Sequence, residues 1–126
     1  MDLKTAKPTV FLATRDADVS RVFYEQKLGL QLSADDAFAL VYQLAGVELR
    51  LSKVPDHTPP PFTVLDWQVD DIQAAHAKLS ANGINPVIFD GMGQDASGIW
   101  DSPDGGARIL WFKDPDGHVL SVSERS

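Results

Sequence analysis

The sequence has 126 residues, of which 44% are hydrophobic and 23% charged, a composition typical of an ordinary soluble globular domain. Folding of a chain this long buries about two-thirds of the surface that the unfolded chain exposes, so neither a disulfide nor a structural metal is required. The formal net charge of −7, with no cluster of Lys or Arg, argues against nucleic-acid binding, which depends on a basic surface.

Membrane insertion and secretion are not expected either. No apolar run approaches the roughly 18 residues of a membrane span. The start, MDLKTAKP, lacks the apolar core of a signal peptide. The absence of Cys excludes thiol chemistry and disulfides. We therefore expect a cytoplasmic protein without a membrane or nucleic-acid partner.

The first elements predicted are a strand and a helix. Residues 8–14 (PTVFLAT) are rich in the β-branched and aromatic residues typical of a strand. In residues 16–29, Asp16 or Asp18 can cap a helix, and Gly29 can end it. Apolar residues at helical spacing between these points give the helix a buried face.

Three strands are predicted to follow this helix. The first two, residues 30–33 and 37–43, are joined by a short turn. In the third, residues 47–52 (VELRLS), apolar and polar residues alternate strictly, which is typical of a half-buried strand. The alternation places three polar residues on one face: Glu48, Arg50 and Ser52.

Residues 54–61 (VPDHTPPP) follow this strand and are rich in proline. Each proline removes a backbone donor and cannot continue a sheet, so we interpret this segment as a connector. Beyond it, residues 62–69 predict a strand and residues 70–83 a helix, with Asp70 as its cap and Gly83 as its stop. A short strand is predicted at residues 86–89, and the glycine-rich loop 90–98 leads from it to another strand. The last two strands, residues 107–113 and 119–123, form a hairpin around DPDG.

The two halves of the chain repeat the same order of elements. Asp16 and Gly29 are 13 residues apart, as are Asp70 and Gly83, and the two pairs are offset by 54 residues. We therefore interpret the chain as one domain of two βαβββ repeats, at about residues 8–53 and 62–124.

Three segments carry a resemblance to a known family: RDADVSRVFYEQKLGLQL (residues 15–32), VELRLS (47–52) and FKDPDGHVLSVSE (112–124). With them the sequence resembles the vicinal oxygen chelate superfamily, also called the glyoxalase/bleomycin resistance protein/dioxygenase family. The resemblance implies an α+β fold in which two βαβββ modules form an incomplete barrel around a cavity. It also implies a homodimer, and it leaves open whether the barrel closes within one chain or across two.

The resemblance also implies where a metal would lie, because enzymes of the family bind one through His or Glu on the first and last strands of each module. The corresponding positions here are Thr9, Val64 and Ser121, with either Glu48 or Arg50 as the fourth, depending on the register of VELRLS. Thr, Val and Ser cannot replace the His, Cys or carboxylate ligands of a divalent metal. We therefore expect no metal and no other cofactor.

The three histidines are weak candidates for a metal site. His57 lies in the connector, where exposure is expected, and His76 lies on the inner face of the second predicted helix. His118 directly follows the DPDG turn, where a polar hairpin residue is ordinary. None is assigned as a ligand.

Strand alternation and the family resemblance together predict a polar lining with aromatic residues on which a flat ligand could stack. The simpler alternative is the solvated face of a sheet. Arg50 could bind a ligand carboxylate or pair with Glu48 or Asp66, and the glycine-rich loop could be a mobile lid or a set of tight turns. The predicted ligand-binding residues are Thr9, Phe11, Glu48, Arg50, Val64, Asp66, Gln68, Trp100, Trp111 and Ser121.

Three functions remain open on this sequence. The first is a metal-independent binding protein of the bleomycin-resistance type, which sequesters an antibiotic or another aromatic or cationic small molecule. The second is an isomerase, lyase or dioxygenase of the same fold, with Glu48 or Asp66 as acid–base catalyst and Arg50 stabilising an oxyanion. The third is a regulatory or accessory domain. The missing metal ligands, the acidic charge and the aromatic residues favour the first.

Overall fold

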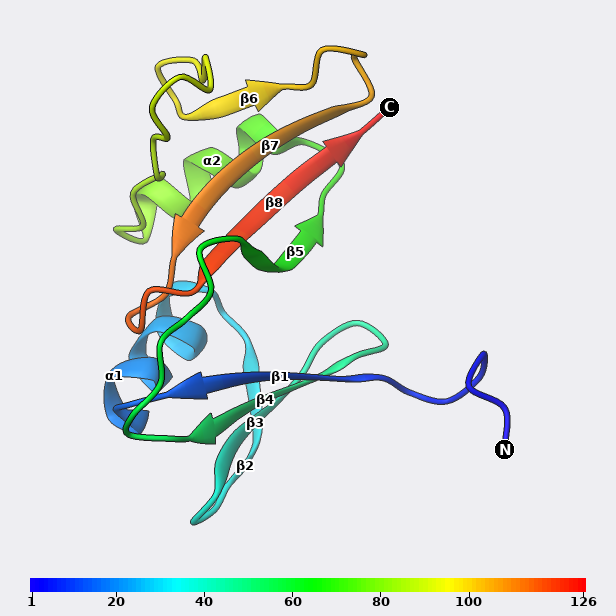
Figure 1. Cartoon of the computed structure of the whole chain (residues 1–126), viewed down its shortest axis with the longest axis vertical. Helices are drawn as coiled ribbons and strands as arrows, with labels where there is room; N and C mark the ends of the chain where they lie inside the picture. The colour runs from blue at the N-terminus through cyan, green and yellow to red at the C-terminus, as the bar shows by residue number, and fades with distance from the viewer. The chain divides into compact units, whose positions relative to one another are not determined.

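The computed structural model describes all 126 residues and contains two compact units, Met1–Thr58 and Pro59–Ser126. Each unit has its own four-stranded sheet and its own helical segment (Figure 1). The units are described one at a time below.

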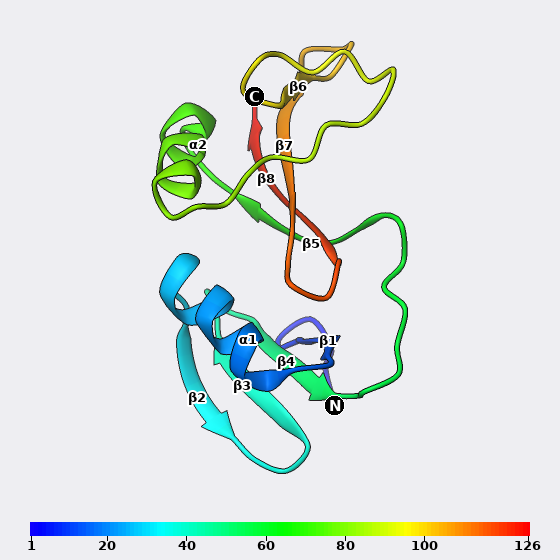
Figure 2. The same cartoon turned by 90° about the vertical axis from the view of Figure 1, so that its left-hand side faces the viewer.

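The first unit forms its sheet in the strand order β1-β4-β3-β2, with β1 parallel to β4 and the other neighbours antiparallel. Its helical segment follows β1 and lies against one face of this sheet (Figure 2). The elements are β1 (Thr9–Thr14), α1 (Ala17–Arg21), the π-helix η1 (Val22–Lys27), β2 (Gln31–Asp35), β3 (Ala39–Gln43) and β4 (Glu48–Lys53).

Local sequence signals fix both ends of this helical segment. The Asp16 carboxylate accepts hydrogen bonds from the backbone N–H groups of Asp18 and Val19, at 3.1 and 3.3 Å, and so caps the first turn. Gly29, with φ of +75°, takes the left-handed conformation that ends a helix at low steric cost. Of the two caps that the sequence allowed, Asp16 is therefore the one used.

The core of the first unit lies between the helical segment and the sheet. Tyr42, fully buried on β3, contacts the ring of Tyr24 at 5.8 Å and donates a hydrogen bond to Glu25 at 3.0 Å. Hydrogen bonds from Arg21 and then from Tyr42 hold the pKa of Glu25 below its usual value, while burial raises the pKa of Tyr42. These contacts tie η1 to the sheet through a neutral phenol and a carboxylate.

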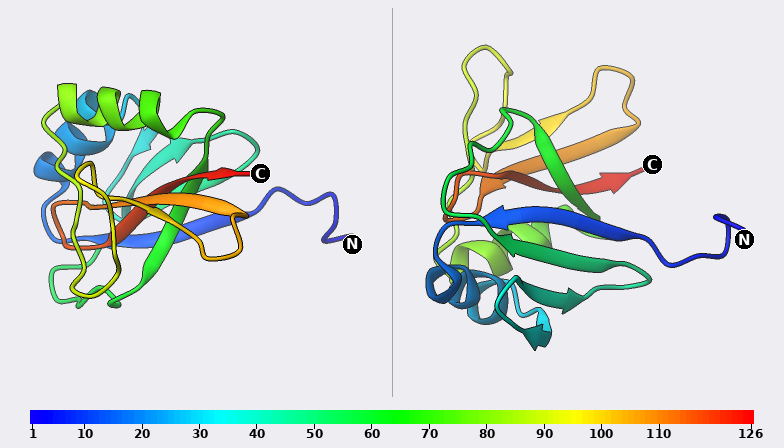
Figure 3. Two further views of the ribbon diagram at one scale, coloured as in Figure 1. Left: turned by 90° about the horizontal axis from the view of Figure 1, so that it is seen from above. Right: turned by 60° about the horizontal axis from the view of Figure 1, so that its bottom comes forward.

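The second unit repeats this architecture, with strand order β5-β8-β7-β6 and with β5 parallel to β8. Helix α2 covers one face of the sheet (Figure 3). On that face Trp67 and Phe112 stack at 6.4 Å, and Glu124 accepts a hydrogen bond from the first helical N–H, that of Ile72. The elements are β5 (Thr63–Gln68), α2 (Ile72–Ala81), β6 (Ile99–Asp101), β7 (Ala107–Lys113) and β8 (Val119–Arg125).

Two local predictions for this unit are wrong. Residues 86–89 do not form a strand: Pro86 has no N–H to donate, and Val87 makes a single backbone bond, to Trp111, at 2.8 Å. The cap of α2 is Asp71 rather than Asp70, because Asp71 directly precedes the first helical residue and its carboxylate accepts from the N–H of Ala74.

The architecture confirms the predicted α+β class and the two βαβββ repeats. Each sheet has four strands in an open order, so neither closes on itself. None of the helices has the length and apolar character that crossing a membrane would require.

Gly98 provides a test of the glycine-rich loop. Its φ is +84°, and an added Cβ would lie 2.7 Å from the Cβ of Pro86, whereas Gly91, with φ of +78°, has nothing within 4 Å. Both Ala variants carry the conformational cost, but only Gly98→Ala adds a clash. We expect Gly98→Ala to lower the free energy of unfolding by about 1–3 kcal/mol more than Gly91→Ala, measured by urea denaturation. Equal losses of unfolding free energy in the two variants would show that Pro86 moves away from the new methyl group without cost.

Candidate functional site

The helix-free face of the first sheet carries four of the predicted ligand-binding residues. In the parallel pairing of β1 and β4, Thr9 lies opposite Glu48 and Phe11 lies opposite Arg50. Both charged residues of VELRLS are therefore on the same face, as strand alternation predicts. Phe11 is 64% exposed, which leaves a large aromatic surface uncovered on this strand.

The two charged residues of this face have different surroundings. Glu48 accepts a hydrogen bond from the side chain of Gln43 at 3.1 Å, and Gln43 in turn accepts one from Lys7. Arg50 makes no ion pair with Glu48; its charge acts on Asp36, whose pKa is lowered chiefly by backbone hydrogen bonds from residues 38 and 39 and to a smaller extent by Arg50. Of the two internal partners that the sequence allowed for Arg50, Glu48 or Asp66, Glu48 is therefore not used.

The helix-free face of the second sheet is organised around Asp66. Ser121 lies directly opposite Asp66 across the β5–β8 pairing, and Ser123 follows two residues later on the same face. The Ser121 hydroxyl donates to Oδ1 of Asp66 at 2.6 Å and the Ser123 hydroxyl donates to Oδ2 at 2.7 Å. Both serines are buried, whereas the Asp66 side chain keeps 27% of its surface exposed.

An aromatic cluster lies beside this carboxylate. Trp111 pairs with Ser121 across β7 and β8, so its ring is on the Asp66 face, and Phe112 faces α2 instead. The Trp111 ring is 6.0 Å from that of Trp100 and 5.5 Å from that of Phe89. Its indole N–H donates to the hydroxyl of Thr63 at 3.0 Å, which fixes the orientation of the ring.

A β-bulge changes the predicted lining on β5. Thr63 pairs with Val119 and Leu65 with Leu120, so Val64 is the extra residue of the bulge and has no partner on β8. Regular alternation assigned this face to Val64, Asp66 and Gln68. The structure adds Thr63, which sequence reasoning missed because a bulge has no local signature here. Gln68 is exposed at the end of the strand.

The side chain of Gln94 holds the glycine-rich loop in place through hydrogen bonds to backbone groups at both ends of the loop. Its side-chain oxygen accepts from the N–H of Phe89 at 2.8 Å, and its amide nitrogen donates to the carbonyls of Val87 and Gly98, at 2.9 and 2.8 Å. Three hydrogen bonds from one half-buried side chain favour a set of fixed turns over a mobile lid. The loop therefore supports Phe89 and Trp100 at the aromatic cluster.

The DPDG turn is a second polar centre of this unit. Asp114 accepts hydrogen bonds from the N–H groups of Asp116 and His118, and its other oxygen is 2.8 Å from the imidazole Nδ1 of His118. His118 is only 3% exposed, so it is not the ordinary polar hairpin residue that the sequence predicted.

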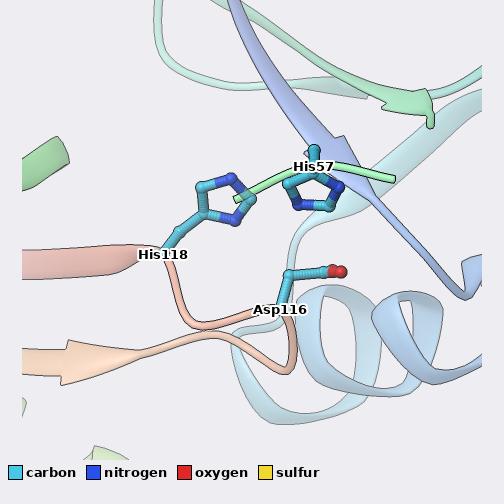
Figure 4. Close-up of side chains that lie close together, drawn as sticks. All are labelled: His57, Asp116 and His118. Atoms are coloured by element: carbon cyan, nitrogen blue, oxygen red, sulfur yellow. The ribbon is translucent and has the colours of Figure 1, made fainter. Parts of the chain in front are cut away.

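Figure 4 shows the side chains of Asp116 and His118 on this turn. Imidazole and carboxylate groups are the ligands that divalent metals prefer, so the side chains of Asp116 and His118 bear directly on the expectation of no metal.

The residues at the positions that the family resemblance relates to a metal do not fit one. The Ser121 hydroxyl donates a hydrogen bond to Asp66, Val64 is apolar, and Thr9 offers only a hydroxyl group. Glu48 is the single carboxylate of the set. A divalent ion needs several charged or imidazole ligands, and these positions do not provide them.

Comparison with known proteins identifies the family. The profile of the Glyoxalase/Bleomycin resistance protein/Dioxygenase superfamily matches residues 7–122. The chain therefore belongs to this superfamily. No curated protein sequence matches the chain.

Solved structures share the fold. A glyoxalase/bleomycin resistance protein/dioxygenase from Nocardioides is 24% identical, with a TM-score of 0.71 and coverage of 99% of this chain and 86% of that one. A glyoxalase family protein from Enterococcus faecalis is 20% identical, with a TM-score of 0.74 and coverage of 98% and 100%. A family protein from Alicyclobacillus acidocaldarius is 16% identical, with a TM-score of 0.72 and coverage of 99% and 95%. At these identities the likeness concerns the fold alone.

Proposed function

We propose that the protein binds a small organic molecule, aromatic or cationic in character, without the help of a metal ion. One observation carries the proposal: Ser121, at a position where the family resemblance places a metal ligand, donates a hydrogen bond to Asp66. The position thereby becomes part of a hydrogen-bonded carboxylate rather than a metal centre.

The aromatic cluster supports binding of a flat molecule beside this carboxylate. Trp100 and Trp111 are both only partly buried, so their rings retain surface that a ligand can cover. Indole rings supply a large apolar contact area with little conformational freedom to lose. Sequestration of an antibiotic or a similar compound would need no further chemistry.

The enzymatic alternative, an isomerase, lyase or dioxygenase, has less support from these residues. A general base needs a lone pair directed at the proton to be removed. Both Asp66 oxygens already accept a serine proton, and the Glu48 carboxylate accepts from Gln43. These contacts occupy lone pairs that a general base would direct at a substrate proton, so binding is favoured over catalysis.

A thermal-shift screen of metal-stripped protein tests this function. We expect at least one aromatic or cationic compound to raise the melting temperature by several degrees, by the same amount with and without EDTA, because ligand binding to the native state stabilises it. Elemental analysis after incubation with Mn, Fe, Ni and Zn salts is expected to find less than one metal per chain.

A ligand effect that disappears with EDTA, or one tightly held metal per chain, would contradict metal independence. In that case the variants Asp116→Asn and His118→Gln would test whether the DPDG turn supplies the ligands, each by its loss of bound metal. Absence of any stabilising compound from the library would contradict the binding function itself.

We further propose a cytoplasmic homodimer. Each sheet ends in two edge strands that pair on one side only within their own unit, β1 and β2 in one sheet and β5 and β6 in the other, and such edges are surfaces for pairing. Light scattering coupled to gel filtration is expected to give twice the 13.8 kDa chain mass. A monomer at micromolar concentration would contradict the dimer, and recovery outside the cytoplasmic fraction would contradict the location.

A further inference from the structure

We propose that Asp66 is the recognition group for a protonated amine or a similar hydrogen-bond-donating cation, and that Arg125 is a resident cation which the ligand displaces. The inference rests on the proposed function, because it names the ligand class and an internal competitor of the same site. It follows from the hydrogen-bond directions, the charges and the exposure of the residues around Asp66.

The unused hydrogen-bonding capacity at Asp66 consists of acceptors. The hydroxyl protons of Ser121 and Ser123 both point to the carboxylate and both serines are buried, so the accessible acceptors are those of the Asp66 carboxylate itself. A carboxylate has about four lone-pair positions, and the serines occupy two of them. The indole N–H of Trp111, directly across from Ser121, is already donated to Thr63. A ligand must therefore bring the donors.

The negative charge of Asp66 narrows the class of ligand further. Asp66 is an anion whose side chain is 27% exposed, so it is accessible to a ligand group yet partly shielded from water. A neutral donor would leave this charge uncompensated when the ligand covers it, and an anionic ligand would be repelled. An ammonium, amidinium or guanidinium group satisfies both the lone pairs and the charge.

Arg125 provides the internal reference for such a group. Its Nη2 lies 3.8 Å from Oδ2 of Asp66, beyond hydrogen-bond distance, and its side chain is 59% exposed. An exposed ion pair of this kind contributes little free energy. A ligand cation that makes direct hydrogen bonds can replace it, and Arg125 then acts as a weak competitor for the carboxylate.

The aromatic cluster fits the same ligand class. Trp111 lies directly across β7–β8 from Ser121, with Trp100 at 6.0 Å from its ring. A cation held near an indole face gains a favourable cation–π interaction, and the apolar part of the ligand can lie on the rings. The expected ligand therefore combines a flat apolar group with a protonated nitrogen.

The simpler interpretation is that Asp66 only joins β5 to β8 through the two serines. That role would make Asp66 matter for stability, but it would give the protein no preference for the charge of a ligand. Charge preference is therefore the property to measure.

Three compounds of nearly equal shape provide the test: 2-phenylethylamine, 2-phenylethanol and phenylacetate, which are cationic, neutral and anionic at pH 7. Isothermal titration calorimetry on the full chain is expected to show the amine binding at least about 10-fold more tightly than the alcohol, with phenylacetate weakest. In Asp66→Asn the amine is expected to lose that advantage, while affinity for the alcohol stays unchanged. The matched control Asp101→Asn, at a carboxylate 73% exposed and paired with Arg108, should bind all three compounds as the wild type does.

The variant Arg125→Gln is expected to change the affinity for the amine in the opposite direction. Removal of the competing cation is expected to tighten binding of the amine about 3-fold and to leave the alcohol unaffected. Because Arg125 is exposed, this variant decides the question even if Asp66→Asn fails to fold. Unchanged or weaker amine binding in Arg125→Gln would overturn the competitor role.

Equal affinities of the wild type for amine and alcohol would overturn the cation assignment while leaving small-molecule binding intact. Failure of all three compounds to bind would also overturn it. The proposed function would then be decided separately by the metal-free library screen, so the two failures are distinguishable.

Discussion

The parallel pairing of the first and last strands of each module is the constraint on which both candidate faces depend. It places Asp66 opposite Ser121, 55 residues later in the chain, and Thr9 opposite Glu48. Parallel neighbours need a crossover connection, which the helical segment and the intervening hairpin provide in each unit. The hydrogen bonds of Asp66 are therefore a product of topology. In their absence two buried serine hydroxyls would lose the partner they have in this structure.

Much of this fold follows from local sequence signals. Asp16 and Gly29 delimit the first helical segment because a cap and a left-handed glycine act within a few residues of themselves. Strict alternation in VELRLS places Glu48 and Arg50 on one face for the same reason, since side-chain direction along a strand depends only on parity. Ser121 was assigned to the candidate site by the family resemblance, and Asp66 by alternation from Val64. Their direct hydrogen bond was not predicted, because it depends on the register between two distant strands.

The features that escaped prediction are the non-local ones. The bulge that removes Val64 from the pairing and brings in Thr63 depends on how β5 meets β8. The fastening of the glycine-rich loop by Gln94 depends on three backbone groups that converge only in the folded unit. The predicted strand at 86–89 failed because apolar residues near Pro86 match a strand in composition but cannot supply its hydrogen bonds. In each case local propensity was overridden by tertiary hydrogen bonding.

The most direct test of the central claim, an amine-binding face without a metal, is nuclear magnetic resonance of the three tryptophan indole N–H groups during titration with 2-phenylethylamine in EDTA. Trp100 and Trp111 lie on the Asp66 face, whereas Trp67 stacks on Phe112 beneath α2 and serves as an internal reference. Phe substitutions assign the three signals. The account predicts saturable shifts of the Trp100 and Trp111 signals with a much smaller change for Trp67. No saturable shift, shifts that require an added metal, or a shift of Trp67 alone would contradict it.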